Sequence, residues 1–149
     1  MCPTSSEVPS LPYAVLQADG ASWGNPGESG CSYVLTDRRG RELAAEGRYI
    51  GRTTNNVAEY QGLIAGLRKA RELGVTELVV RLDSELIVSQ LTGVYRVRAE
   101  HLKALHDLAK SLLSSFARTS VQHVPRANNA RADALATEAV KTALAARRP

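Results

Sequence analysis

The chain has 149 residues, of which 44% are hydrophobic and 23% charged, with 19 lysines and arginines against 15 acidic residues. This length and composition predict one globular domain and exclude a wholly disordered protein. No apolar run approaches the roughly 20 residues of a membrane-spanning helix, and two cysteines cannot form a disulfide framework. We therefore expect an intracellular, cytoplasmic protein that does not enter a membrane. The net charge of +4 permits an anionic partner without identifying one.

The first third of the chain predicts an antiparallel meander. Residues 1–12 hold three prolines and three serines without periodicity, which predicts a disordered tail ahead of a domain over residues 13–146. Strand-like segments follow, at residues 13–19, 31–36 and 41–50. The segments between them are rich in Gly, Pro, Asn and Asp, as turns require. Short turns between consecutive strands favour antiparallel pairing.

The remainder of the chain alternates helical and strand patterns. Apolar residues at helical spacing predict a helix over residues 56–73, which Gly74 ends. The further predicted elements are a buried strand at 77–83, a short helix at 84–91, a helix from about residue 100, a strand at 119–124, a loop at 125–129 and a helix at 130–146. Strand–helix–strand crossovers make parallel neighbours. The order therefore predicts an α/β fold in which helices flank a mixed sheet.

Four acidic residues stand at comparable places in this order of elements. Asp19 and Asp83 end strands, whereas Glu59 and Asp133 lie in the first turns of helices. Strand ends and the helix starts that follow them gather along one edge of an α/β sheet. Four carboxylates at one edge repel each other unless cations lie among them, and Mg²⁺ favours oxygen ligands. No Cys/His cluster has zinc spacing.

Each acid also has a purely structural interpretation. Asn56 and Glu59 have the spacing of a helix capping box, and Asp83 could be the N-cap of the helix that follows it. Asp133 could complement a helix dipole, and Asp19 could be a turn residue beside Gly20. These interpretations do not explain why all four acids map to one edge.

Four motifs resemble type 1 ribonuclease H in their order and spacing. ADGASWGNPGESG is similar to the family's opening strand and glycine-rich turn, and TTNNVAEYQGLIAGL to its first helix. LDSELIVSQL is similar to its Asp-Ser motif, and HVPRANNARADALA to its final loop and helix. The resemblance runs from about Tyr13 to Val140. It implies a five-stranded mixed sheet, and an endonuclease that hydrolyses the RNA strand of RNA–DNA hybrids, leaving 5′-phosphate and 3′-hydroxyl ends.

The resemblance also implies the roles of individual residues. Asp19, Glu59, Asp83 and Asp133 would hold two Mg²⁺ ions, or Mn²⁺ as a substitute, for a two-metal mechanism. Either His123, ten residues before the last Asp, or Arg126 in the following loop would assist at the scissile phosphate. The implied substrate contacts are Gly20, Asn25, Thr54, Asn55, Asn56, Ser84 and Asn129.

The chain departs from many relatives where they carry a basic protrusion. TGVYRVRAEH is short, with only Arg96 and Arg98, so this is the compact form and we expect weaker binding of the hybrid. Trp23 either stacks on substrate or, the simpler expectation, packs. The alternative function is a weakly active or inactive module that binds hybrid or double-stranded RNA, within a larger protein. All four acids favour the enzyme, and we expect a monomer without an obligate protein partner.

Overall fold

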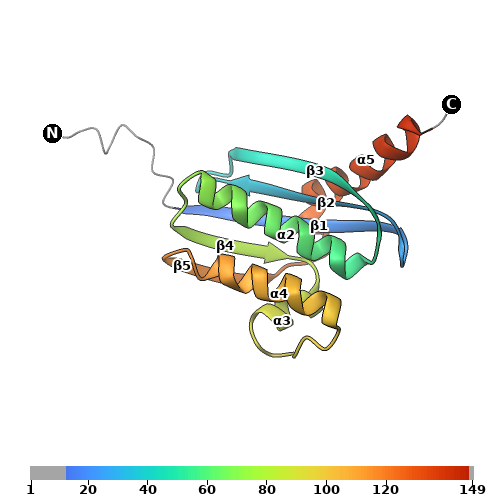
Figure 1. Cartoon of the computed structure of the whole chain (residues 1–149). Coiled ribbons are helices and arrows are strands. Elements are labelled where there is room, and N and C mark those ends of the chain that lie inside the picture. The colour runs from blue at the N-terminus through green and yellow to red at the C-terminus, as the bar shows by residue number, and fades with distance from the viewer. Residues whose placement is uncertain (1–12, 148–149) are drawn as a thin grey trace.

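The computed structural model describes residues 13–147, so the predicted tail over residues 1–12 lies outside the described residues. One sheet organises the molecule (Figure 1). Its strands are β1 (Tyr13–Gly24), β2 (Gly27–Thr36), β3 (Glu42–Thr53), β4 (Glu77–Leu82) and β5 (Arg118–His123). The helices are α2 (Asn55–Glu72), α3 (Glu85–Leu91), α4 (Glu100–Leu113) and α5 (Ala130–Ala146), with a single 3₁₀ turn, η1 (Arg126–Asn129), before α5.

The strand order is β3-β2-β1-β4-β5, and the predicted mixed pairing is confirmed. β1 pairs antiparallel with β2, and β2 with β3, whereas β1, β4 and β5 are parallel neighbours. β4 therefore ends beside the middle of β1, because the two strands run in the same direction and pair from Tyr13 with Glu77 to Gln17 with Arg81. This arrangement collects residues from distant parts of the chain at one place.

Helices cover both faces of the sheet. Successive side chains of a strand point to opposite faces. On β2, the Ser32 hydroxyl donates to the Ala132 carbonyl of α5 at 2.5 Å, whereas Tyr33 lies against Gly66 of α2. α4 packs beside α2 on the second of these faces, and Figure 1 shows α2 and α5 on opposite sides of the sheet. No helix of residues 13–147 has the length and apolar character needed to cross a membrane.

The first hairpin differs from the sequence prediction. Residues 20–30 were expected to form a loop, but β1 and β2 continue through them and only Asn25 and Pro26 connect the two strands. Gly24, at a φ of 103°, makes the turn, and the hydroxyls of Ser22 and Ser29 share a hydrogen bond of 2.6 Å across the ribbon. Polar cross-strand pairing thus extends both strands through residues 20–30, where the sequence has no alternation of apolar and polar residues that would predict a strand.

Glycines let α2 lie close against the sheet. A Cβ at Gly62 would lie 2.6 Å from the Ser32 carbonyl oxygen, and a Cβ at Gly20 would lie 2.5 Å from the backbone nitrogen of Glu59. Gly20 therefore does not turn the chain, as the sequence suggested, because it lies within β1 and makes room for α2. The close approach brings the start of α2, with Glu59, next to the middle of β1, with Asp19.

Candidate active site

Three carboxylates from separate elements meet where β4 ends beside the middle of β1. Asp19 lies on β1, Glu59 on the first turns of α2, and Asp83 directly after β4. One carboxylate oxygen of each lies within 4.8 Å of the others, which is close enough for a shared cation. We call these three side chains the acid cluster. The prediction that acids far apart in sequence converge is thus confirmed for three of the four.

Asp133, the fourth predicted acid, lies at the margin of the acid cluster. It comes from the first turn of α5, and its charge contributes to the raised pKa of Asp19. Its place in that turn also suits the helix dipole, so the structural interpretation applies to Asp133 beside the functional one.

Burial makes the acid cluster unfavourable for negative charge. Asp19 is only 4% exposed, and this burial, with the charges of Asp83 and Asp133, raises its pKa to about 7. Burial and the charges of Asp19 and Asp83 raise the pKa of Glu59 to about 8. The Gly20 backbone N–H, which donates to Asp19 at 2.9 Å, offsets part of this shift. A bound cation would stabilise the charged forms of both carboxyls.

The helix caps are made by other residues than the acids. Thr54 caps α2 by accepting from the Val57 backbone N–H at 3.3 Å, so Glu59 is too far along the helix for a capping box. Ser84 caps α3 by accepting from the Ile87 backbone N–H at 3.3 Å, which leaves Asp83 without that role. Asp19 lies inside β1 rather than in a turn. Capping and turn formation therefore do not account for the acid cluster.

Asn129 has a place that the sequence did not indicate. Its side chain is 1% exposed and donates to Asp83 and to the Ala18 carbonyl, both at 3.0 Å. Its amide oxygen accepts from the Gln17 side chain at 3.2 Å. Asn129 therefore makes an internal contact that orients the Asp83 carboxylate. Nothing in the spacing of Gln17 and Asn129 along the chain signals this contact.

Other predicted substrate residues surround the start of α2. Asn25, at the tip of the first hairpin, accepts from the Asn55 backbone N–H at 3.1 Å and so ties the hairpin to α2. Asn55 is exposed and Asn56 half-buried in the first turn of α2. Trp23, expected to pack, is 47% exposed near the same tip. A ring and amide groups are thus available to a ligand that passes this end of the sheet.

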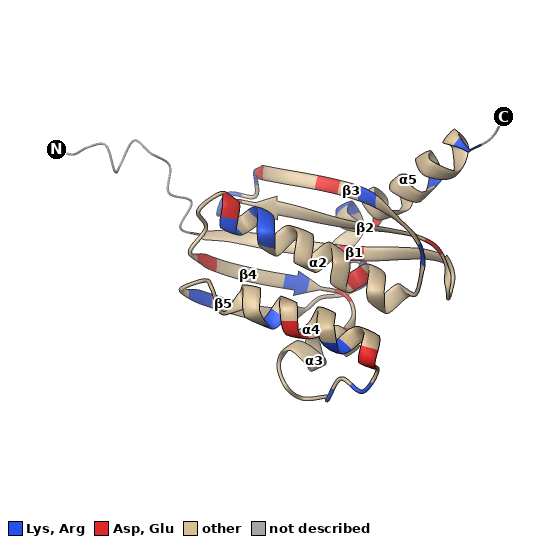
Figure 2. Cartoon of the chain, in the orientation of Figure 1, with Lys and Arg blue, Asp and Glu red and all other residues tan. Residues whose placement is uncertain are grey.

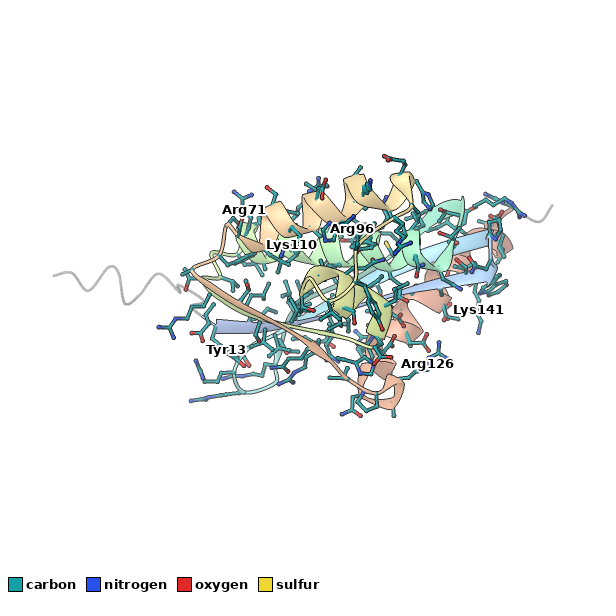
Figure 3. The ribbon with its side chains drawn as sticks, turned by 90° about the horizontal axis from the view of Figure 1, so that it is seen from below. Tyr13, Arg71, Arg96, Lys110, Arg126 and Lys141 are labelled. Atoms are coloured by element: carbon teal, nitrogen blue, oxygen red, sulfur yellow. The ribbon has the colours of Figure 1, made fainter. Side chains whose placement is uncertain are left out.

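The structure separates the two candidates in the final loop. His123 ends β5 and is exposed, so its alternation with Val121 along the strand, which would also suit a packed side chain, does not bury it. Arg126 is also exposed, at the start of η1, and its positive charge acts on Glu59, whose pKa it lowers in part. Figure 3 shows Arg126 at the same end of the molecule as α5. Arg126 therefore reaches the acid cluster electrostatically.

The donor atoms of the acid cluster fit a hard divalent cation. The three residues offer only carboxylate oxygens, and their mutual repulsion is what a cation relieves. Asp83 already has one oxygen held by Asn129, which orients the carboxylate. The residues thus suit Mg²⁺ or Mn²⁺.

Known proteins are similar to this chain in both sequence and fold. A family model described as reverse transcriptase-like matches residues 17–139. The bifunctional protein Rv2228c of Mycobacterium tuberculosis is 47% identical over 130 residues, which are 87% of this chain and 36% of that protein. The chain thus spans about a third of the length of that relative.

Two solved structures match nearly along their whole length. The crystal structure of RNase H1 from Halobacterium salinarum has a TM-score of 0.85 and 43% identity, over 87% of this chain and 98% of that chain. LC11-RNase H1, isolated from compost and solved in complex with an RNA/DNA hybrid, has a TM-score of 0.84 and 40% identity, over 88% of this chain and 99% of that chain. Fold and site together define the ribonuclease H-like class of protein. The chain belongs to the reverse transcriptase-like family and, within it, to the type 1 ribonucleases H.

Proposed function

We propose that this chain is a metal-dependent endonuclease that hydrolyses the RNA strand of RNA–DNA hybrids. The observation that carries the proposal is the acid cluster, three carboxylates brought within 4.8 Å of each other at a cost in repulsion that a cation removes. The likeness to LC11-RNase H1, solved with a hybrid, supports the class of substrate. A protein that only bound nucleic acid would gain nothing from this cluster.

The acids would hold two Mg²⁺ or Mn²⁺ ions, with Asp133 completing the set. Such ions would supply an activated water for in-line attack on phosphorus and a positive charge at the leaving oxygen, which would give 5′-phosphate and 3′-hydroxyl products. Asn129 keeps the Asp83 carboxylate in one orientation. The Gly20 backbone N–H does the same for Asp19.

Recognition of the RNA strand requires groups that sense a 2′-hydroxyl, because this group distinguishes RNA from DNA. Glu59 and the exposed Asn55, which lie within the first turns of α2, are the groups we assign to it. Arg126 would contact the scissile phosphate, as its guanidinium can bind two phosphate oxygens at once. His123, two residues before Pro125, is the alternative candidate for assistance at the scissile phosphate.

A cleavage assay with three labelled substrates tests the proposal. The chain is incubated with RNA–DNA hybrid, double-stranded RNA or single-stranded RNA, with Mg²⁺, with Mn²⁺ or with EDTA. We expect cleavage of the hybrid that EDTA abolishes. Hybrid that binds but stays intact under both metals would overturn the proposal in favour of the inactive binding module.

A further inference from the structure

β3 forms one outer edge of the sheet (Figure 1). Among residues 13–147 its only strand partner is β2, and no backbone hydrogen bond joins residues 43–52 to another element. None of the residues of β3 is fully buried, whereas most of those of β2 are. The backbone N–H and C=O groups on the outer side of β3 are therefore free to pair with a further strand.

Two bulges limit which part of β3 can take a partner. The register against β2 shifts at Leu43 and again at Ile50, where β3 carries one residue more than β2. Bulges at a sheet edge oppose indiscriminate pairing with other strands. The six residues 44–49 between the bulges pair regularly with β2. They are the stretch of the edge that a further strand can extend.

The charges of β3 are arranged symmetrically about Gly47. Glu46 and Arg48 flank it directly, and Glu42 and Arg52 lie five residues to either side. Figure 2 shows acidic and basic segments following one another along this strand. When two copies of β3 pair antiparallel about Gly47, Glu46 of each copy lies opposite Arg48 of the other, and Glu42 opposite Arg52. Opposite charges in facing positions stabilise a pair of strands.

This register is favoured over its neighbours. A shift by two residues in one direction would place Glu46 opposite Glu46 of the second copy, and in the other direction Arg48 opposite Arg48, and both are repulsive. Within one chain Arg48 already donates to Glu46 at 2.8 Å, and both side chains are substantially exposed. The four side chains of two copies would thus alternate in charge. Such exposed charges determine the register, whereas the affinity must come from other contacts.

An apolar groove follows the same edge on the face of the sheet that α5 covers. It has a volume of about 410 Å³ and is lined chiefly by Gly47 and Tyr49 of β3 and by Leu135, Ala139 and Ala143 of α5. Facing residues of an antiparallel pair point to the same side, so both copies would carry α5 on one face of the joined sheet. The two grooves then meet beside the axis, and their contact removes apolar surface from water.

We propose that the edge of β3 is a self-association surface, at which two copies of this chain pair antiparallel about Gly47. Their two five-stranded sheets would join edge to edge. The occupant is a second copy because the charges of β3 complement those of the same strand reversed. The dimer departs from the monomer that we expected from the sequence, and it forms at high concentration. It is independent of the nuclease function, since no residue of the acid cluster lies on β3.

Sedimentation velocity and amide hydrogen exchange of the chain in EDTA, without nucleic acid, test this proposal. We expect a reversible dimer to become populated as the concentration rises from about 10 µM to about 1 mM. Over the same range, exchange of the outward-facing amides among residues 44–49 should slow, because they become hydrogen-bonded to the second copy. A chain that remains monomeric throughout, or a dimer that leaves exchange in β3 unchanged, would overturn the proposal.

Charge-reversal variants identify the pairing itself. Glu46→Arg and Arg48→Glu each bring like charges face to face, so each alone should weaken dimerisation about tenfold or more. An equal mixture of the two variants should restore it, because opposite charges then face each other. Arg71→Glu and Glu72→Arg are the matched controls, since they reverse exposed charges on α2 away from this edge, and they should dimerise like the parent chain.

Two results with these variants would count against the pairing about Gly47. One is equal weakening by the β3 and the α2 variants, and the other is a mixture that dimerises no better than its components. Loss of folding cannot imitate the expected result, because mixing two unfolded variants would not restore a dimer. The unfolding temperature of each variant reports its folding independently.

Discussion

A cavity lined by the end of α3, the loop over residues 93–97 and one side of α4, here called the α3–α4 pocket, carries the cations Arg96, Lys103 and Lys110. This pocket and the acid cluster lie at opposite ends of α3 and are built in opposite ways. Asp83 precedes the helix start, and Gln90 of the pocket lies at its last turn. The acids come from three separate elements and two of them have raised pKa values because they are buried together. The cations of the pocket come from one loop and one helix and remain exposed.

The negative charge of the acid cluster is brought together by tertiary structure, whereas the positive charge of the pocket is already close together in the sequence. Buried like charges oppose folding, so the fold tolerates the acid cluster only with hydrogen bonds and protons to offset it. Exposed cations on a loop have little effect on stability. Changes at the acid cluster should therefore alter activity and stability together, whereas changes of the exposed cations at the pocket should leave stability almost unchanged.

The largest effect is expected for Asp19→Asn. Loss of a carboxylate ligand should lower the rate of hybrid cleavage by about 10²–10³-fold or more, because the electrostatic term at the reacting phosphate is lost. The same variant should unfold at a higher temperature than the parent chain in EDTA at pH 8, because one buried like charge is gone. Single-turnover assays and thermal unfolding measure the two effects. Unchanged turnover would refute the assignment of Asp19 as a metal ligand.

Asn129→Ala should have the second largest effect, through Asp83. Residues that orient a metal ligand typically account for 10–100-fold in metal affinity or activity, and we expect a loss of about that size. The metal concentration that gives half-maximal cleavage should rise, which a purely structural role would not produce. Asn128→Ala is the matched control, because that side chain is exposed and only its carbonyl accepts from Gln17, at 2.6 Å. Similar metal requirements in both variants would contradict the positioning role of Asn129.

The order and type of the helices and strands could be predicted from the sequence, but contacts such as that of Asn129 could not. The helical spacing of Tyr60, Leu63 and Leu67 predicts the buried face of α2, and these residues are fully buried. Periodicity succeeds here because one face of the helix packs on the sheet. It fails at residues 20–30, since the pairing of this hairpin depends on hydroxyls and glycine rather than on apolar alternation.

In the candidate site, too, one part could be predicted from the sequence and another could not. The convergence of Asp19, Glu59 and Asp83 follows from the order of strands and helices, because β4 runs parallel to β1 and ends beside its middle, where α2 begins close to Gly20. The bonds of Asn129 to Asp83 and Ala18 depend on how the loop after β5 folds back on β1. Such contacts join residues that are far apart in the chain and produce no regular spacing from which they could be predicted.

Substitutions of Arg126 and His123 are expected to differ in their effect on the rate of hybrid cleavage. Arg126→Ala should lower the rate of hybrid cleavage about tenfold, since one charge-assisted contact to phosphate is lost. His123→Ala should have a smaller effect, because only the charge of Arg126 acts on Glu59. Steady-state rates across pH 6–9 distinguish a phosphate contact, which lowers the rate at every pH, from a proton-transfer role, which changes the shape of the profile. Equal and negligible losses would dismiss both residues.

The stability of the metal-free chain should fall as the pH rises. The pKa of Asp19 is raised to about 7 and that of Glu59 to about 8, above their ordinary values of 3.8 and 4.5. Between about pH 4 and 8 the folded chain thus retains protons that the unfolded chain has released, and raising the pH favours unfolding. We expect the unfolding temperature in EDTA to decrease by several degrees from pH 5 to 8.5, and Mg²⁺ to reduce the slope.

A pair of variants assigns this slope to the acid cluster. Asp19→Asn should flatten it. Asp37→Asn should not, because Asp37 is a turn residue whose pKa is lowered by hydrogen bonds from the backbone N–H groups of Arg41 and Arg39. An unfolding temperature that is constant or rises over this range in the parent chain would contradict the raised pKa values.

The smallest effect is expected where the two regions are joined. The Tyr60 hydroxyl, next to Glu59 in the chain, donates to the Gln90 side chain at 2.7 Å in the core, and the Gln90 carbonyl bonds to His106 at 3.1 Å. Tyr60→Phe leaves a buried acceptor without its donor and should destabilise the fold by about 1–2 kcal/mol. Tyr60→Phe with Gln90→Leu should recover part of that loss, since both polar partners are then absent. Denaturant unfolding measures both, and cleavage should change less than about threefold if the bond serves stability alone. A larger loss of cleavage than of stability would instead show that this bond sets the distance between α2 and α3, and with it the position of Glu59 relative to Asp83.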